Sequence, residues 1–307
     1  IRVGSVRLDA GPIVLAHLHR DCAAPSRVTV RAHLDKSGQG VLIALPQGEV
    51  DRTDPMLREM TSDPTHRKVL ITDGKSATGQ ALAKALVDAG TDIVWLGVAE
   101  PWKQAAPALK LPQLEYMALD VTDEKSVRDL AGVIGGKVDI LISNAELHRN
   151  HTIADRGTET ARAEMEVNYL GLMRLAQAFG PAMRARAAEN TGATAWVNLL
   201  SIHALSALPS HGTFSASKAA ALALSQNLRA EMRHSGIRVV NVFPGPIDDE
   251  WNQLVPPPKL APAALAKAIV TALRDGAEDV YPGDVAQDLI TRFRESQKVL
   301  ERELWDQ

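Results

Sequence analysis

The sequence contains little of what marks the most specialised classes of protein. It has one cysteine, Cys22, among 307 residues, so it can form no internal disulfide and no cysteine cluster for a metal ion. Its formal net charge of -3 provides no polybasic surface for nucleic acid or an anionic membrane. No apolar run approaches the roughly 18–20 residues that a membrane-spanning helix needs. We therefore expect a cytoplasmic protein without a nucleic-acid or membrane partner.

What the chain does contain is the composition of a folded globular protein, arranged in two regions of different pattern. Hydrophobic residues make up 45% of the chain and charged residues 23%. In residues 1–65, turn-forming residues separate four β-favouring runs, Ile1–Leu8, Pro12–Leu18, Arg27–Leu34 and Val41–Leu45. We expect a small β-meander there. It is too short to bury a good core alone, so it should pack on the rest of the chain or on another subunit.

Three histidines in this first region raise the question of a metal site. They are His17, His19 and His33, and two histidines on one strand face could bind a metal ion. No acidic or cysteine partner lies at a matching spacing, so we expect packed or solvated histidines and no metal.

The second region, residues 66–307, alternates strand and helix patterns. The expected strands are Lys68–Thr72, Asp92–Leu96, Leu114–Leu119, Val138–Ser143, Ala195–Leu200 and Ile237–Phe243. The expected helices include Gly79–Ala89, Glu164–Ala188, Thr213–His234 and Pro262–Arg274. Apolar strands that alternate with helices predict an α/β fold with a doubly wound parallel sheet. Ligands of such sheets bind beyond the carboxyl ends of the strands.

Seven short motifs follow one another along this second region. They are Thr72-Asp73-Gly74-Lys75-Ser76-Ala77-Thr78-Gly79, Leu119-Asp120-Val121-Thr122-Asp123, Ser143-Asn144-Ala145-Glu146, Asn168, Ser201, Phe214-Ser215-Ala216-Ser217-Lys218 and Phe243-Pro244-Gly245-Pro246. Each motif alone is weak, but in this order and spacing they resemble the short-chain dehydrogenase/reductase family over roughly residues 67–307. The resemblance implies a Rossmann-like sheet, an oligomer built through two long helices, and an oxidoreductase that uses NAD or NADP.

The resemblance also implies a role for each matching residue. The catalytic positions correspond to Ser201, Lys218, Asn168 and Phe214, the last of which stands where the family has its tyrosine. The cofactor-binding positions correspond to Thr72, Gly74, Gly79, Asp120, Asn144 and again Lys218. Asp120 matches an adenine-contacting aspartate, and Asn144 matches an asparagine that helps to hold the central strands together. Both residues are also structural in relatives, so their presence does not demonstrate cofactor binding.

Three departures from the family pattern affect cofactor binding. Asp73 and Ala77 replace two glycines of the turn at which the pyrophosphate meets a helix N-terminus, and Glu146 replaces a glycine beside the nicotinamide. A carboxylate near the diphosphate is repulsive, by roughly 1–4 kcal/mol at about 4 Å. Two alternatives stay open: Asp73 caps the helix while pointing away from the groove, or Glu146 turns outward as a solvated acid. We expect NAD or NADP to bind weakly or not at all.

A fourth departure affects proton transfer. The family's tyrosine passes a proton to or from the substrate oxygen, and Phe214 has no ionisable proton. A histidine near the pocket, His203, His211 or His148, is the alternative donor, with an ordinary pKa near 6.5.

These departures leave three hypotheses for function. The favoured one is a degenerate family member that acts as a structural or regulatory subunit, in a homo-oligomer or in a hetero-oligomer with an active relative. The second is an NAD(P)-dependent oxidoreductase with a displaced proton donor. The third is a cofactor-independent cyclase, lyase or isomerase that uses Ser201 and Lys218. The choice between NAD and NADP rests on Glu100, which gives weak support for NAD.

Overall fold

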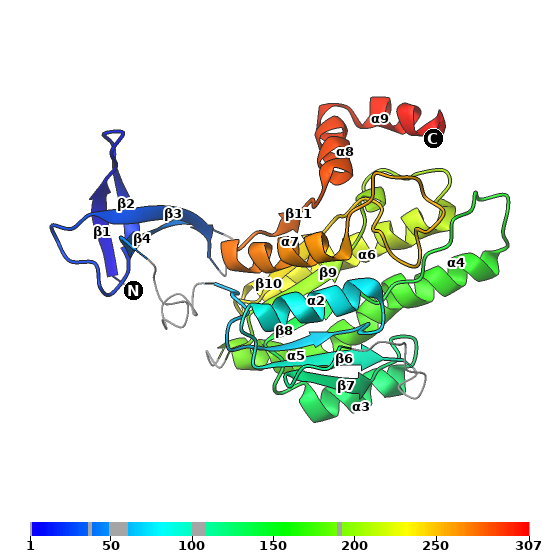
Figure 1. Cartoon of the computed structure of the whole chain (residues 1–307), viewed down its shortest axis with the longest axis horizontal. Coiled ribbons are helices and arrows are strands. Elements are labelled where there is room, and N and C mark those ends of the chain that lie inside the picture. The colour runs from blue at the N-terminus through cyan, green and yellow to red at the C-terminus, as the bar shows by residue number, and fades with distance from the viewer. Residues whose placement is uncertain (1, 36–38, 49–60, 100–108, 189–191, 307) are drawn as a thin grey trace.

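A small β-sheet and a large α/β unit make up the chain (Figure 1). The computed structural model describes every residue except 1, 36–38, 49–60, 100–108, 189–191 and 307. Glu100, the residue on which the cofactor preference rests, therefore lies outside the described residues.

The small sheet contains the four expected strands in an unexpected order. The strands are β1 (Arg2–Arg7), β2 (Ile13–Leu18), β3 (Val28–Leu34) and β4 (Gly40–Pro46), and their order is β1-β2-β4-β3. The pairs β1–β2 and β3–β4 are antiparallel, whereas β2 and β4 pair in parallel. The prediction of a simple meander was therefore wrong. The physical reason is burial: β4 carries the buried run Ile43–Leu45 and takes a central place, while the polar-apolar β3 lies at an edge.

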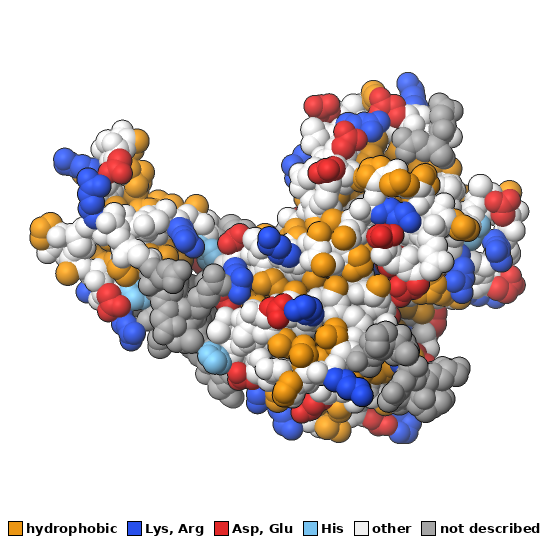
Figure 2. All heavy atoms as spheres, viewed as in Figure 1, with side chains coloured by type: hydrophobic (Ala, Val, Ile, Leu, Met, Phe, Trp, Pro, Cys, Tyr) orange, Lys and Arg blue, Asp and Glu red, His pale blue; other side chains and the backbone are white. Residues whose placement is uncertain are grey.

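The small sheet stands beside the amino ends of the large sheet, away from the carboxyl ends (Figure 1), and forms the lobe on the left of the surface in Figure 2. The segment 61–66 joins the two, and Ser62 is tied into the large sheet because its hydroxyl donates to Thr194 O at 3.4 Å and accepts from Arg238 at 3.2 Å. A Cβ atom added at Gly276 would lie 3.1 Å from the ring of His33, so this histidine packs against the large unit. Among the described residues, no group of three or more His, Cys, Asp or Glu is placed to hold a metal ion.

The large sheet has seven parallel strands, as the doubly wound prediction requires. They are β5 (Lys68–Ile71), β6 (Ile93–Val98), β7 (Leu114–Ala118), β8 (Ile140–Ser143), β9 (Ala195–Leu199), β10 (Arg238–Val242) and β11 (Asp279–Val280), in the order β11-β10-β9-β8-β5-β6-β7. After β7 the chain returns to the other side of β5 and continues outward from β8. The loops after β5 and β8 therefore form the switch point where such folds bind ligands.

Helices cover both faces of the large sheet. They are α2 (Ala77–Asp88), α3 (Glu124–Ile134), α4 (Thr158–Met165), α5 (Leu172–Ala188), α6 (Gly212–Arg233), α7 (Pro262–Asp275), α8 (Asp284–Glu295) and α9 (Gln297–Glu303), with the short turns η1 (Glu166–Gly171), η2 (Ile202–Ala204) and η3 (Leu304–Asp306). Val69 of β5 shares a core with Leu82 of α2 and Ile269 of α7, and the next residue, Leu70, shares the opposite core with Phe179 of α5. Strand residues are thus buried alternately on two faces, which explains the continuous apolar strand sequences.

The long helix expected over Glu164–Ala188 is interrupted. α4 begins earlier, at Thr158, and η1 is a π-helical turn between α4 and α5. π-Helical turns are rare, and those that occur often lie at functional sites. None of the described helices is long and apolar enough to cross a membrane.

Candidate active site

Thr72 and Asn144 join the two loops of the switch point. Thr72 follows β5, and its hydroxyl oxygen accepts from the backbone N–H groups of Asn144 and Ala145, each at 3.0 Å. The side chain of Asn144 accepts from Asp73 N at 2.8 Å and donates to Asp73 O at 2.7 Å. These two predicted cofactor-binding residues therefore hold the loops together, which is the structural role that the family resemblance implies for Asn144.

Gly79, which the family pattern retains, and Gly74, at a variable position of that pattern, both lie where a side chain would not fit. A Cβ atom at Gly74 would lie 2.5 Å from Leu96 Cβ, and one at Gly79 would lie 1.9 Å from Asp73 O. Contacts that short are not possible without moving the backbone. Packing of the turn alone therefore requires Gly74 and Gly79.

Asp73 shapes the turn instead of capping the helix. Its Oδ1 atom accepts from Lys75 N at 3.0 Å and from Ser76 N at 3.3 Å. The cap of α2 is Ser76, whose hydroxyl accepts from Gly79 N at 3.0 Å. The alternative in which Asp73 caps α2 was therefore wrong. Burial raises the pKa of Asp73, and the nearby charge of Glu250 raises it further against those backbone hydrogen bonds.

Glu250 reaches the start of α2 from the loop after β10. The N–H of Ala77, the first residue of α2, donates to Glu250 Oε2 at 3.4 Å. This is the helix end at which the family's pyrophosphate binds. The sequence analysis missed Glu250. The signal that could have found it is the run Asp248-Asp249-Glu250, three consecutive acids that begin two residues after Pro246, the last residue of the Phe243–Pro246 motif.

Asp120 uses its carboxylate within its own turn. The Oδ1 atom accepts from Thr122 N at 2.9 Å and from Thr122 Oγ1 at 2.7 Å. The residue lies directly after Leu119, near the end of β7, and is half-buried. This position agrees with a turn-forming role, and the adenine contact stays a prediction from the resemblance.

Glu146 and Lys218 form a buried ion pair at the centre of the site. Glu146 Oε2 lies 2.6 Å from Lys218 Nζ, and the two side chains are 12% and 3% exposed. Lys218 also donates to Leu199 O at 3.0 Å. The alternative in which Glu146 turns outward was therefore wrong. The cation that the resemblance assigns to cofactor binding and to proton transfer is instead paired with a carboxylate of the same chain.

Asn168 and Ser201 serve the local backbone. Asn168, in η1, accepts from Leu147 N at 3.0 Å and donates to Leu147 O at 2.9 Å, and so fixes the loop that carries Glu146. The Ser201 hydroxyl caps η2 by accepting from His203 N at 3.2 Å. Among the described residues, no hydrogen bond joins Ser201 to Lys218, although both lie at the carboxyl end of the sheet.

Phe214 lies in an aromatic cluster with three buried histidines. Its ring is stacked on His148 at 3.8 Å between centroids, while His211 lies edge-on to His148 at 4.7 Å and to His203 at 5.1 Å. The Lys218 ammonium lies 5.5 Å from the centre of the Phe214 ring. The structure therefore brings Phe214 and Lys218 together, as their helical spacing predicts.

Burial keeps these histidines neutral. It lowers the pKa of His148 and of His211 to about 3, with the charge of Lys218 adding to the effect at His148, and it lowers the pKa of His203. Burial in this cluster therefore works against a histidine donor that titrates near pH 6.5, and a histidine that replaces the tyrosine stays a prediction.

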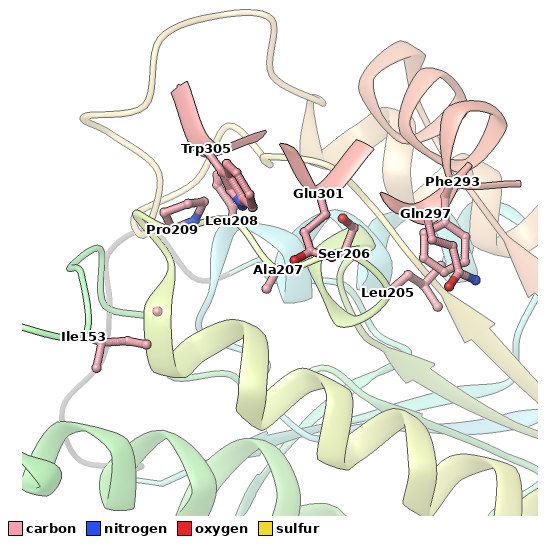
Figure 3. A pocket seen from close by; sticks show the side chains of 11 residues that line it. Ile153, Leu205, Ser206, Ala207, Leu208, Pro209, Phe293, Gln297, Glu301 and Trp305 are labelled. Atoms are coloured by element: carbon pink, nitrogen blue, oxygen red, sulfur yellow. The ribbon is translucent and has the colours of Figure 1, made fainter. Parts of the chain in front are cut away.

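A pocket of about 530 Å³ lies on the side of the loop 205–212 that faces the C-terminal helices (Figure 3). Leu205, Leu208 and Pro209 form its floor, and Phe293 and Trp305 close it from α8 and η3. Gln297 contributes an amide to the lining, and Glu301 contributes a carboxylate. Its lining residues do not include Ser201, Phe214 or Lys218. The pocket is therefore separate from the ion pair.

Comparisons with known proteins agree with the fold and the motifs. Residues 67–258 match the family model described as short chain dehydrogenase. A short-chain dehydrogenase from Burkholderia cenocepacia, solved in complex with NADP, is 35% identical, with a TM-score of 0.72 over 79% of this chain and 98% of that chain. One from Streptomyces avermitilis is 26% identical, with a TM-score of 0.65 over 79% of this chain and 97% of that one. An uncharacterised oxidoreductase from Staphylococcus haemolyticus is 30% identical over 69% of this chain and 92% of its own length.

Proposed function

The chain belongs to the short-chain dehydrogenase family, and we propose that it is a member without ordinary carbonyl-reductase activity that acts as a structural or regulatory subunit of an oligomer. The observation that carries this proposal is the environment of Lys218. Phe214 lies one helical turn before it in place of the family's tyrosine, and Glu146 neutralises its charge at 2.6 Å. Both changes act on the same proton-transfer step.

The first support comes from the groups in the site that could give or take a proton. A phenylalanine cannot give or take a proton, and general acid catalysis is typically worth about 10²–10⁴ in rate. His148 and His211, the nearest aromatic neighbours of Phe214, are neutral at pH 7 because their pKa values are lowered to about 3. The Ser201 hydroxyl accepts a backbone hydrogen bond within its own turn. These surroundings support a site in which the phenol is not replaced.

The second support comes from two carboxylates that stand where the family holds its dinucleotide. The start of α2 and the side chain of Lys218 are the two places where the family binds the pyrophosphate and the nicotinamide end. Glu250 occupies the first and Glu146 the second. A dianionic pyrophosphate beside Glu250 and Asp73 is repelled by both. We therefore propose that NAD and NADP bind weakly or not at all.

The third part of the proposal is assembly. The outward face of α6 carries small exposed side chains, Ala216, Ala219 and Ala223, and α5 exposes 37% of Met173. Small side chains let another helix approach closely, so this face suits a second copy or an active relative. A stable monomer in sedimentation at micromolar concentration, without a co-purifying partner, would contradict the proposed assembly.

The test of the proposed function is turnover by the unmodified protein. A panel of ketones and aldehydes is incubated with NADPH and with NADH, and oxidation of the reduced cofactor is followed by absorbance. The expected result is no rate above the uncatalysed background with any substrate. Robust, saturable turnover of one carbonyl compound would overturn the proposal.

A second candidate is an NADP-dependent oxidoreductase, which the 35% identical relative in complex with NADP favours. That activity requires Glu250 and Glu146 to leave the groove and requires a proton donor other than Phe214. The same panel distinguishes the two candidates. A cytoplasmic location stays a prediction that cell fractionation tests.

A further inference from the structure

We infer that the loop 248–259 is an autoinhibitory plug. The loop places Glu250 at the N-terminus of α2, while Glu146 pairs with Lys218. Two carboxylates of the chain itself therefore occupy both anchor points, the places where the family would hold the two ends of a dinucleotide. The two contacts lie on different loops, one after β10 and one after β8. A loss of function by drift alone does not explain why an acid sits at each point.

The plug has a built base. Ile247 and Leu260 form a parallel β-bridge, and Asp248 N donates to Leu260 O at 2.9 Å. Lys259 pairs with Asp248 at 3.5 Å across the same base. The loop therefore leaves the body and returns to it at one point, so that its tip can lie over the start of α2.

The tip of the plug is shaped by Asp249. Its Oδ1 atom accepts from Trp251 N at 3.1 Å, from Asn252 N at 3.3 Å and from Asn252 Nδ2 at 3.0 Å. This turn fixes the backbone directly after Glu250, so that the Glu250 side chain leaves the backbone at a defined position. Asn252 is buried at 4% exposure, which holds the turn against the body.

The plug also contacts the loop that carries Glu146. The Arg149 guanidinium lies 5.5 Å from the centre of the Trp251 ring, a cation–π contact between the loops after β8 and β10. Arg149 N in turn donates to Glu164 Oε1 at 3.0 Å, and Glu164 is fully buried. The two carboxylates thus belong to one connected layer over the groove, which would have to open as a unit for a dinucleotide to enter.

The negative charge of this layer opposes the binding of an anion, and its acids lie close enough to repel one another. Asp249 is near enough to Glu146 and to Glu250 for both charges to raise its pKa, after burial, which is the larger cause; the pKa reaches about 6. Removing one acid therefore relieves the others as well as freeing its anchor point.

The two anchor points are tested separately with fragments of the cofactor. Adenosine diphosphate carries the pyrophosphate and probes the α2 end, whereas nicotinamide mononucleotide probes the Lys218 end. Binding to the full chain is measured by isothermal titration for Glu250→Gln and for Glu146→Gln. The matched control is Glu166→Gln, an acid of η1 that lies outside the plug and pairs with Arg174.

Glu250→Gln is expected to strengthen adenosine diphosphate binding about fivefold or more, the effect of one like charge at about 4 Å in water. Glu146→Gln is expected to do the same for nicotinamide mononucleotide, and each variant should leave the other fragment unchanged. Equal effects of Glu250→Gln and Glu166→Gln would overturn the plug, because they would show a general charge effect. Failure of every variant to bind either fragment would overturn it too.

Although this inference rests on the proposed function, the two fail in different experiments. Fragment binding needs no turnover, so the plug can be refuted in a protein that is catalytically silent. Turnover by the unmodified protein would refute the proposed function whatever the fragments do.

Discussion

Two buried ion pairs lie at opposite ends of the same strand, β8, and they differ in what they do. At the amino end, Asp139 pairs with Arg186 at 2.7 Å, with side chains 9% and 19% exposed. At the carboxyl end, Glu146 pairs with Lys218 at 2.6 Å. We call them the amino-end pair and the carboxyl-end pair.

The amino-end pair is embedded in backbone hydrogen bonds. Asp139 also accepts from Lys68 N at 2.8 Å, and Arg186 donates to Val138 O at 2.8 Å, so the pair ties β5, β8 and α5 together. The carboxyl-end pair has a single such bond, from Lys218 to Leu199 O, and it lies near another acid, because burial and then the charge of Glu146 raise the pKa of Asp249. The amino-end pair therefore ties elements of the fold together, whereas the carboxyl-end pair neutralises the lysine that the family uses in its site.

The largest expected effect comes from reversing together the departures from the family pattern at the carboxyl end of the sheet. Phe214→Tyr combined with Asp73→Gly, Ala77→Gly, Glu146→Gly and Glu250→Gln restores the proton donor and the glycine pattern of the family and removes the carboxylate from the start of α2. We expect measurable carbonyl reduction, with the phenol contributing about 10²–10⁴ in rate. Phe214→Tyr alone should restore little, because Glu250 and Glu146 still occupy the groove. Cofactor oxidation with the carbonyl panel measures both variants. Full activity from the single change would contradict the account.

The next effect is on folding at the amino end. Asp139→Ala leaves Arg186 and the Lys68 N–H without their carboxylate, and breaking a buried pair in this way costs about 3–5 kcal/mol. Glu146→Ala should cost less, because removing its charge also relieves Asp249. Urea unfolding at pH 7 compares the two variants. Equal losses, or a larger loss at Glu146, would show that the two pairs are alike.

These two comparisons also separate what the sequence could predict from what it could not. Six of the seven strands of the large sheet were predictable because residues such as Val69 and Leu70 are buried on opposite faces, which leaves an apolar run in the sequence. The two-residue strand β11 was not predicted. The closeness of Phe214 and Lys218 was predictable because helical spacing is local.

The direction of Glu146 was not predictable, because it depends on a lysine from a distant helix. The same holds for Glu250, whose partner is a backbone N–H at the start of α2. In the small sheet, each run predicts a strand, but nothing local predicts that β4 lies between β2 and β3. Contacts between distant segments decide all three cases.

A smaller effect is the acid sensitivity of the carboxyl end. The pKa of His148 is about 3 in the folded chain and near 6.5 when unfolded, so only the unfolded chain takes up a proton between these values. Stability is then fully present above pH 6.5 and falls as the pH drops toward 3, by about 2 kcal/mol at pH 5 for this residue.

His148→Phe keeps an aromatic ring against Phe214 and removes the titration, so the difference in unfolding free energy between pH 7 and pH 5 should shrink. Exposed His234→Gln serves as the control. An unchanged difference in the His148 variant would contradict the assigned pKa.

The smallest effect concerns Asp249. Its pKa of about 6 lies above that of the unfolded chain, so its contribution to stability is present below about pH 4 and is lost as the pH rises through about 6. Asp249→Asn keeps the oxygen that accepts from Trp251 and Asn252 and should stabilise the protein at pH 8 by about 1 kcal/mol after allowance for solvent screening. Thermal unfolding at pH 8 and pH 4 checks this; a gain that is equal at both values would point to another cause.

The most direct test of the account is isothermal titration of the unmodified protein with NADPH, NADP, NADH and NAD. The carboxylates of Glu250 and Glu146 already occupy the start of α2 and Lys218, so we expect dissociation constants above about 1 µM for all four. Submicromolar binding of any of them by the unmodified chain would show that the groove accepts a dinucleotide, and would contradict the account.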